Sequence, residues 1–399
     1  MVAMDNAAEE SGTVAGLPPI MAAVFAGFLL IGLALPVLPL HLHQGLGFGP
    51  FAVGLVTGSQ FAASLLSRIG AGNYADMRGG KRAVAVGLIA AALAGLIYLA
   101  SLALLGRPMA SASMLFVGRA VLGGSESFII TGGVAWGLAL AGARNSGKVI
   151  AWVGTAMFAA LALGAPIGSA LYAAGGFAAI ALATIALPLA TLLVTLPMRG
   201  IRQAGNSTRQ PWTNVARAVW LPGVAAAFSS LGYGAILSFA TLLFAERGWQ
   251  PVWLPFTAYA ASLIAARLCF GHLPDRLGGA RVAAIFVAVE AAGLALIWLA
   301  PGPAPATMGA GLVGLGYSLV YPGLGAVAVS RLPSSSRGLA MGLYTVFLDA
   351  ALGFGSPALG LLAASAGLQF IFLAVAAATL PAFAIALLLA CKPSTARRV

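Results

Sequence analysis

Three acidic residues lie inside long apolar stretches and hold most of the chemistry that this sequence offers: Glu126, Glu290 and Asp349. The other six of the nine acids lie near the amino terminus, in two polar hairpins or at the end of an apolar segment. An ionisable side chain at membrane depth costs about 3 kcal/mol or more, so it is by default a functional candidate. At 1.5 Å per residue, Glu126 and Asp349 lie roughly 16–22 Å from their helix ends, near the middle of a bilayer.

The helix faces that carry Glu126 and Asp349 are small and polar, because residues three and four apart share a face. Faces that meet lipid are large and apolar, so these two faces meet protein or a water-filled cavity. The face of Glu290 is mostly apolar, and we interpret this residue as the structural partner of a basic or hydroxyl group. The two polar faces consist of Arg119, Gly123, Glu126, Ile130, Gly133 and Gly137, and of Gly342, Thr345, Asp349, Gly353, Ser356 and Gly360.

Glu126 is the residue that we predict to carry a proton. Coupled transport needs a group whose protonation differs between two access states. A midplane carboxyl fits this role because arginine does not deprotonate and the midplane holds no lysine or histidine. Arg119 lies two turns before Glu126 and can bias its protonation, or else it is a buried structural arginine. Asp349 is the second candidate, and the alternative for both acids is that they only cross-link helices through hydrogen bonds.

The composition of the chain is that of an integral membrane protein. Of 399 residues, 61% are hydrophobic and 8% are charged, with a mean hydropathy of +1.00, whereas a soluble domain has about 25% charged residues. Residues 11–67, 149–198 and 350–391 contain no Asp, Glu, Lys or Arg. Each of these runs is long enough for two spans of about 20 residues. The two cysteines, Cys269 and Cys391, give neither a disulfide framework nor a metal-ligand spacing.

Twelve apolar segments, six in each half of the chain, are expected to span the membrane as an all-α fold. We expect a tail at 1–16, a six-helix bundle at 17–198, a linker at 199–216, a second six-helix bundle at 217–391 and a tail at 392–399. The first segment lacks the flanks of a signal peptide and should remain in the mature protein. The twelve segments are 17–42, 49–71, 83–106, 110–140, 149–173, 176–198, 217–245, 251–271, 282–300, 306–330, 338–365 and 367–391.

The distribution of lysine and arginine predicts that both termini are cytoplasmic. With the amino terminus inside, sixteen of the 21 basic residues fall on the cytoplasmic side, in agreement with the positive-inside rule. The same bias accounts for the net charge of +12. It therefore gives no reason to expect a nucleic-acid partner, which would require a basic patch on a soluble face.

Two polar hairpins, residues 72–82 and 271–281, indicate that the chain is an internal duplication. Glycine, aspartate, paired glycines and arginine recur in register at an offset of 199 residues, from 72 to 271. A second repeat runs from glycine to Gly-x-Pro over 147–166 and over 338–357. Internal repeats of this kind are typical of secondary transporters. The matched pairs are Arg68/Arg267, Gly72/Gly271, Asp76/Asp275, Gly79/Gly278, Gly80/Gly279 and Arg82/Arg281.

The hairpins resemble the signature G-x-x-x-D-[RK]-x-G-[RK]-[RK] of the major facilitator superfamily, and the resemblance covers the whole chain. The sequence departs from the signature at Met77, Gly80 and Gly279. Residues 36–39 (PVLP) resemble the P-V-x-P element of twelve-helix drug:proton antiporters, and 119–123 (RAVLG) their R-x-x-Q-G element. Residues 164–168 (GAPIG) resemble part of the antiporter motif G-P-x-x-G-G. Residues 124–127 and 347–353 are most similar to bacterial inner-membrane exporters of the YhhS/YfcJ type.

This resemblance implies a monomeric secondary transporter in the bacterial inner membrane that exports a small organic molecule or drug in exchange for protons. Proton-coupled import of a small metabolite is the alternative. In this fold, spans 1, 4, 7 and 10 line the cavity, with help from spans 2, 5, 8 and 11. The candidate substrate contacts on these spans are Gln60, Trp136, Tyr233, Tyr259, Tyr317, Tyr321 and Tyr344.

The sequence speaks against an enzyme and against a bound cofactor. It has no nucleophile with a base and no metal-ligand set, which an enzyme site would need. It has no phosphate loop, so ATP is not the expected energy source. The proton is the expected coupling ion. His41 and His43 are two residues apart and point to different helix faces, which is unsuitable for a metal site.

We expect the two hairpins to close the cytoplasmic side in the outward-facing state. Gly72 would let the second span press against the eleventh, which would place Asp76 near the exposed N–H groups at Ser334–Ser336. Asp275 would face Asn145 and Ser146 in the same way. The expected gating residues are Gly72, Asp76, Arg82, Gly271, Asp275, Arg276 and Arg281.

Overall fold

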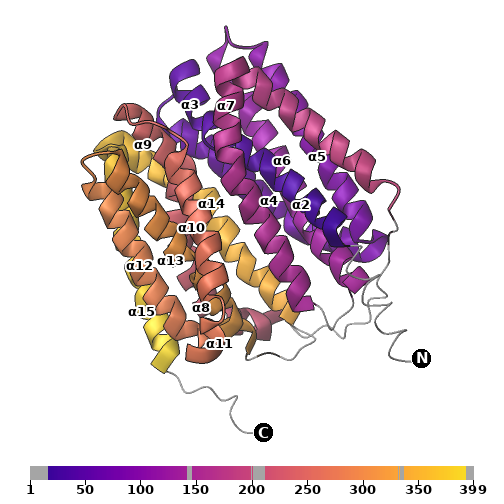
Figure 1. Ribbon diagram of the computed structural model, residues 1–399, viewed down its shortest axis with the longest axis vertical. Helices are drawn as coiled ribbons and strands as arrows, with labels where there is room; N and C mark the ends of the chain where they lie inside the picture. Colours follow the sequence, from indigo (N-terminus) through magenta and orange to yellow (C-terminus); the bar gives the residue numbers. More distant parts are fainter. Residues whose placement is uncertain are drawn as a thin grey trace. The chain divides into compact units, whose positions relative to one another are not determined.

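The structure, a computed structural model, describes residues 17–141, 146–198, 200, 212–330, 332 and 337–391, and these residues are almost entirely helical (Figure 1). The predicted tails 1–16 and 392–399 lie outside the described residues. So do residues 201–211 of the predicted linker, Asn145 and the serines at 334–336, and the side chain of Ser146 is not described.

The first predicted span is interrupted at its prolines. Helix α2 (Leu17–Ala34) ends before Pro36, and α3 (Val37–Leu40) and a π-helical turn η1 (His41–Gly45) follow. Proline has no N–H to donate, and its ring pushes the preceding residue out of the helical region. Pro36 therefore accounts for the break between α2 and α3.

The remaining helices follow the predicted spans closely. The predicted fifth and sixth spans are the two parts of α7, which changes direction at Gly175 and Gly176, where φ is −142° and 61°. The predicted seventh span is α8, a π-helical segment η3 and α9. The bounds are α4 Pro50–Arg78, α5 Gly80–Leu102, α6 Pro108–Ala141, α7 Ser146–Thr195, α8 Trp212–Ala235, η3 Ile236–Ala240, α9 Thr241–Glu246, α10 Leu254–Phe270, α11 Leu273–Leu277, α12 Gly279–Leu299, α13 Pro303–Ser330, α14 Arg337–Ala366 and α15 Leu368–Cys391.

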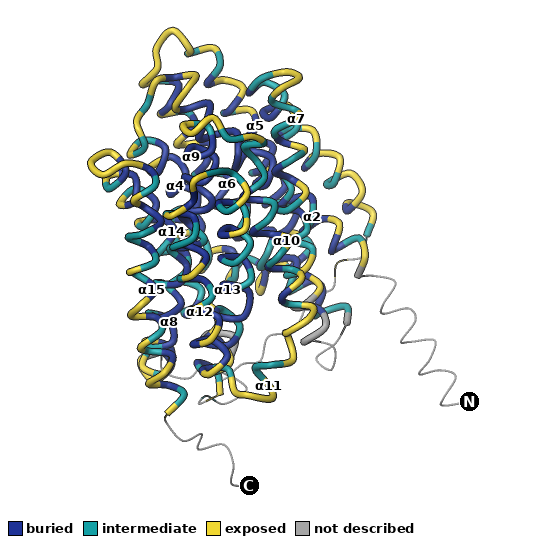
Figure 2. Tube along the Cα trace, turned by 60° about the vertical axis from the view of Figure 1, so that its left-hand side comes forward, coloured by how far each residue is buried: buried dark blue, intermediate teal, exposed yellow. Residues whose placement is uncertain are grey.

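Within the described residues, ten helical segments are long and apolar enough to cross a membrane. One of them, Trp152–Thr195, contains the break in α7, and the shorter apolar helix Leu254–Phe270 comes in addition. Large apolar side chains are widely exposed, for example Leu66 (82%) and Leu268 (74%). Figure 2 shows buried and exposed residues following one another along the same helices. The protein is therefore a multi-pass membrane protein whose outer helix faces meet lipid.

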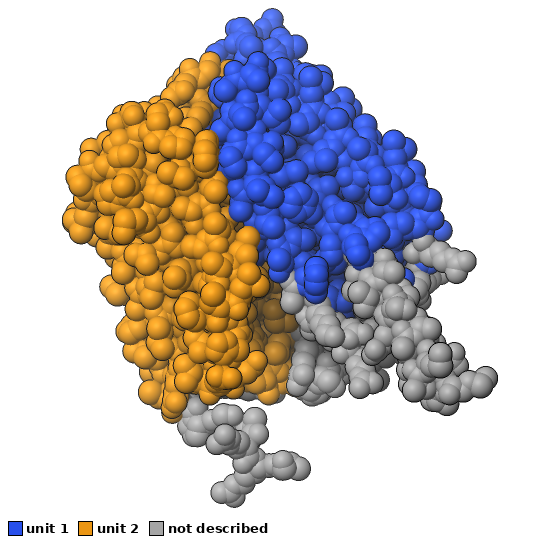
Figure 3. Space-filling view, in the orientation of Figure 1, with its two compact units in different colours: residues 1–37, 62–205 blue, residues 38–61, 206–399 orange. Residues whose placement is uncertain are grey.

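The chain divides into two compact units, shown in different colours in Figure 3. Unit 1 consists of residues 1–37 and 62–205, and unit 2 of residues 38–61 and 206–399. Helix α4 therefore contributes its first part to unit 2 and its second part to unit 1. In unit 2 the first part of α4 packs closely on α14, because a Cβ at Gly54 would lie 2.3 Å from the carbonyl oxygen of Ser356.

Both hairpins turn at a glycine that the repeat places in register. Gly79 has φ 90° and ψ 149°, and Gly278 has φ 89° and ψ 137°. Residues with a side chain rarely adopt positive φ, which explains why glycine recurs at this position. The following glycines, Gly80 and Gly279, lie where helices touch: a Cβ would come within 2.5 Å of the Gly132 oxygen and 2.3 Å of the Gly323 oxygen, respectively.

The antiporter-like residues 164–168 also have a packing role. A Cβ at Gly164 would lie 2.6 Å from the Cα of Gly32, and one at Gly168 would lie 2.1 Å from the oxygen of Leu33. These glycines let α2 and α7 of unit 1 approach to backbone contact, as small residues do between membrane helices.

Candidate transport-site residues

Glu126 lies on α6 between two serines that attach this helix to its neighbours. The Ser125 hydroxyl donates to the Gly87 oxygen of α5 (2.8 Å), and the Ser127 hydroxyl donates to the Ser64 oxygen of α4 (2.9 Å). Both serines are buried, whereas Glu126 is partly exposed. The two bonds fix the rotation of α6 about its axis, so the carboxyl is held on a face that packing does not close.

Arg119 shares α6 with Glu126, as predicted, but it is completely buried. Its guanidinium lies near the Tyr98 hydroxyl of α5, and its three nitrogens have no hydrogen-bond partner among the described residues. The Tyr98 ring contacts Phe177 of α7 at 5.7 Å between centroids. Arg119 is therefore enclosed by packing beside Tyr98, whereas Glu126 is partly exposed on the same helix.

Trp136 and Gln60, two of the candidate substrate contacts, are both fully buried. The backbone of Trp136 lies at the close approach of α6 to Gly80 of α5. Gln60 belongs to the part of α4 that packs in unit 2. The structure thus places both residues in helix packing rather than on an open surface.

Three of the candidate tyrosines form a stack in unit 2. Tyr233 of α8 lies between Tyr259 of α10 and Tyr317 of α13, with ring centroids 5.4 and 5.6 Å apart and interplanar angles of 11° and 23°. The Tyr317 hydroxyl lies 3.1 Å from the Ser230 hydroxyl of α8. Tyr233 is partly exposed and the outer two rings are buried. The sequence nominated these residues singly, and the fold brings them together.

The other two candidate tyrosines connect α13 to α14 beside Asp349. The Tyr321 and Tyr344 rings are 4.8 Å apart, and the Tyr344 hydroxyl donates to the Tyr321 carbonyl oxygen (2.8 Å). The Tyr321 hydroxyl lies 2.7 Å from the hydroxyl of Thr345, one turn before Asp349. Asp349 itself is 2% exposed. It is therefore much less open than Glu126.

Glu290 has the hydroxyl partner that the sequence predicted. The Ser229 hydroxyl of α8 donates to Oε2 at 2.5 Å, and Glu290 is fully buried. Its Oε1 has no hydrogen-bond partner among the described residues. Gly232 leaves the room for this oxygen, since a Cβ there would lie 2.4 Å from Oε1. Ser229 and Gly232 lie on one helix face of α8, and they are neighbours of Glu290 that sequence reasoning missed.

We predict that Ser229→Ala destabilises the protein by about 1–3 kcal/mol, because it leaves a buried carboxyl without its donor. Glu290→Gln should stay close to the wild type, since the amide oxygen still accepts the Ser229 hydrogen bond. Thermal unfolding in detergent, followed by intrinsic fluorescence, measures both. Equal stability of Ser229→Ala and the wild type would mean that the bond is of no structural consequence.

A second set of polar contacts involves residues that the repeat matches. In unit 1 the Ser127 hydroxyl donates to the oxygen of residue 64, and in unit 2 the Ser318 hydroxyl donates to that of residue 263, each at 2.9 Å. Arg68 and Arg267 follow these acceptors by one turn, and they donate to the Ser64 hydroxyl (3.3 Å) and the Ser318 oxygen (3.4 Å). The 199-residue offset pairs residue 64 with residue 263 and Arg68 with Arg267. The repeat in the sequence could therefore have identified the two acceptors and the two arginines, but not the two donor serines.

The expected gating residues lie at helix ends. Gly72 and Asp76 are in the last turns of α4, Arg82 is in the first turn of α5, Gly271 follows α10, Asp275 and Arg276 are in α11, and Arg281 is in the first turn of α12. All five charged side chains are exposed. Among the described residues, no three His, Cys, Asp or Glu side chains are placed to hold a metal ion.

Comparison with protein families gives a match to the Major Facilitator Superfamily over residues 20–312 and 253–399. The uncharacterised MFS-type transporter STM4428 of Salmonella typhimurium (strain LT2) is 40% identical over 361 residues, covering 90% of this chain and 93% of that protein. The uncharacterised MFS-type transporter YhhS of Escherichia coli (strain K12) is 40% identical over 352 residues, covering 88% and 87%.

Two solved structures are similar in fold. A bacterial homolog of the human lysosomal transporter Spinster, in an inward-facing and unoccupied conformation, has a TM-score of 0.77 at 13% identity and covers 95% of this chain and 97% of that one. A mutant form of the nucleoside transporter NupG has a TM-score of 0.72 at 18% identity and covers 94% and 99%.

Proposed function

This chain belongs to the Major Facilitator Superfamily, and on that premise we propose that it exports a small organic molecule in exchange for protons. The family consists of transporters rather than enzymes, and the helical fold is that of a secondary transporter. In our proposal Glu126 carries the proton, Arg119 biases its protonation, and Asp349 is the second carboxyl of the coupling system.

One observation carries this proposal: Glu126 is partly exposed, whereas the other two carboxyls within the apolar helices are buried. A proton carrier must meet water from each side of the membrane in turn, so it cannot be permanently closed off by packing. The serines on either side of Glu126 support the same role, since they hold the carboxyl in one orientation on α6.

We further propose that the chain forms two pseudo-symmetric six-helix halves with cytoplasmic termini, in a bacterial inner membrane. The matched contacts of Gly80 and Gly279, and the matched turns at Gly79 and Gly278, support the duplication. The excess of basic residues on one side supports the orientation. The bacterial relatives support the location.

Substrate screening in proteoliposomes that contain a pH-sensitive dye tests the proposal. The panel consists of amphipathic and anionic organic molecules, with nucleosides added because one solved protein of this fold is a nucleoside transporter. Under antiport, a substrate that enters the vesicle drives protons out and the lumen becomes more alkaline. Acidification of the lumen would instead establish symport, and substrate uptake without any pH change would contradict proton coupling.

We propose that Asp76 controls access from the cytoplasmic side, and we predict that Asp76→Asn favours the inward-open state and slows transport. Folded protein should be retained, because Asp76 is exposed at the end of α4. The measurement is thiol labelling of Gly342→Cys from the cytoplasmic side, in a background where Cys269 and Cys391 are replaced by serine. Position 342 tolerates a side chain, since a Cβ there meets nothing within 4 Å.

Glu246→Gln is the matched control for this experiment. It also removes an exposed carboxylate at a helix end, but at the end of α9, which is not part of either hairpin. Labelling should increase in Asp76→Asn and stay unchanged in Glu246→Gln. Unchanged labelling in both variants would mean that the hairpin only determines membrane topology and does not control access.

A further inference from the structure

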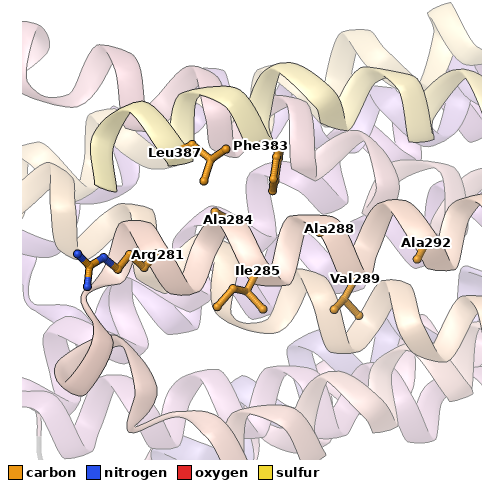
Figure 4. Close-up of a pocket in the computed structure, with 8 residues that line it drawn as sticks. All are labelled: Arg281, Ala284, Ile285, Ala288, Val289, Ala292, Phe383 and Leu387. Atoms are coloured by element: carbon orange, nitrogen blue, oxygen red, sulfur yellow. The ribbon is translucent and has the colours of Figure 1, made fainter. Parts of the chain in front are cut away.

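A groove of about 700 Å³ runs along the outer surface of unit 2 between α12 and α15 (Figure 4). Ala284, Ala288 and Ala292 lie in a row on α12, and Phe383 and Leu387 point toward them from α15. Because these alanines recur every four residues, the row keeps one face of the helix low over roughly 12 Å of its length. The groove therefore has the shape of a channel for an extended apolar chain.

The groove faces the hydrocarbon core of the bilayer. Both of its helices are candidate membrane spans, Gly279–Leu299 and Leu368–Cys391. Ala288, Ala292 and Leu387 are exposed. Every lining residue but one is apolar, so an occupant must be apolar over most of its length.

The exception is Arg281, at one end of the groove. Its side chain is exposed in the first turn of α12, and it has no ion-pair or hydrogen-bond partner among the described residues. Figure 4 shows it extending beyond the row of alanines. This is the end of α12 that the basic-residue bias places at the cytoplasmic surface. A guanidinium there matches the phosphate of a lipid headgroup in charge and in hydrogen-bonding geometry.

We propose that this groove binds an anionic phospholipid of the cytoplasmic leaflet, with one acyl chain along the alanines and the phosphate at Arg281. Apart from Arg281, which is also an expected gating residue, the groove shares no residue with the transport candidates, and it does not depend on which substrate is transported. It assigns Arg281 a lipid partner in addition to its place in the hairpin.

The internal repeat shows which residues create the groove. Arg82 on α5 is the counterpart of Arg281, but the counterparts of Ala288 and Ala292 are Ile89 and Leu93. Both of these large side chains are exposed, by 55% and 49%. Their bulk would fill the channel if they stood on α12. Isoleucine and leucine are therefore side chains that a membrane-facing helix can carry at these two positions.

Native mass spectrometry of the full-length protein in detergent, titrated with dioleoyl phosphatidylglycerol or dioleoyl phosphatidylcholine, tests the site. We expect the wild type to retain one phosphatidylglycerol in preference to phosphatidylcholine. Arg281→Gln should weaken phosphatidylglycerol binding about fivefold, the factor that corresponds to about 1 kcal/mol for one basic residue at an anionic surface. Phosphatidylcholine carries the same phosphate but is neutral overall because of its choline, so its affinity should fall less than that of phosphatidylglycerol in this variant.

The double variant Ala288→Ile/Ala292→Leu tests the acyl-chain channel, and it should weaken binding of both lipids because the channel is filled. Arg82→Gln is the matched control, and it should leave both affinities unchanged. Equal binding of the two lipids by the wild type, or phosphatidylglycerol binding that survives both Arg281→Gln and the double variant, would overturn the proposal. The Arg281 side chain is exposed, so Arg281→Gln should fold, and it tests the site even if the double variant does not fold.

Discussion

Glu126→Gln is expected to bind substrate but to lose accumulation driven by a pH gradient, down to the level of liposomes without protein. Glutamine keeps the shape and hydrogen-bonding capacity of the side chain but cannot release a proton. Energy-independent exchange of substrate should persist, because the helix packing around the residue is unchanged. The measurement compares uptake in reconstituted vesicles with and without an imposed pH gradient.

Two further variants make this result specific. Asp349→Asn should reduce accumulation less than Glu126→Gln, since Asp349 is almost fully buried and less accessible to water. Glu246→Gln, an exposed acid at the end of α9, should behave as the wild type. If Glu126→Gln still concentrates substrate along a proton gradient, the carrier is another carboxyl, with Asp349 first and Glu290 second.

Gly314→Ala is expected to have the largest effect on stability among the glycine substitutions in α13. A Cβ at this position would lie 2.0 Å from the Tyr259 carbonyl oxygen and 2.5 Å from the Ser262 hydroxyl of α10. The two helices must move apart to accommodate it, which costs roughly 1–3 kcal/mol or more. Because Tyr259 stacks on Tyr233, we also expect this variant to weaken substrate binding.

Gly311→Ala is the matched control, one turn away on the same helix. A Cβ there would meet nothing within 4 Å, so the change in stability should stay within about 0.5 kcal/mol. Its carbonyl oxygen still accepts the hydrogen bond from Ser262 (2.6 Å). The measurement compares the melting temperatures of Gly314→Ala and Gly311→Ala in detergent. Similar values would mean that α10 and α13 separate without cost at this point.

The sequence alone was sufficient for the membrane class and for most helix positions. Hydrophobicity is a local property, so runs without charge predicted spans such as 83–106 and 367–391, which the structure places at α5 and α15. Breaks in the helices were also local signals: Pro36 interrupts the first span and Gly175–Gly176 separates the two parts of α7. The superfamily followed from the repeated hairpins, and the family match confirms it.

Only the tertiary structure decided how the candidate residues differ from one another. Helical periodicity places a residue on a face but does not tell which neighbour covers that face. Glu126 and Asp349 had similar small, polar faces in the sequence, yet Glu126 is partly exposed and Asp349 is 2% exposed. For Glu290 the sequence predicted a basic or hydroxyl partner, and the structure identifies it as Ser229.

The same reasoning applies to contacts between segments far apart in the chain. The stack of Tyr233, Tyr259 and Tyr317 joins three helices, and the groove at Arg281 exists only because α15 lies beside α12. Composition and spacing determine which helices form. Their pairing depends on the packing of many side chains at once, and that packing decides which polar groups become a site.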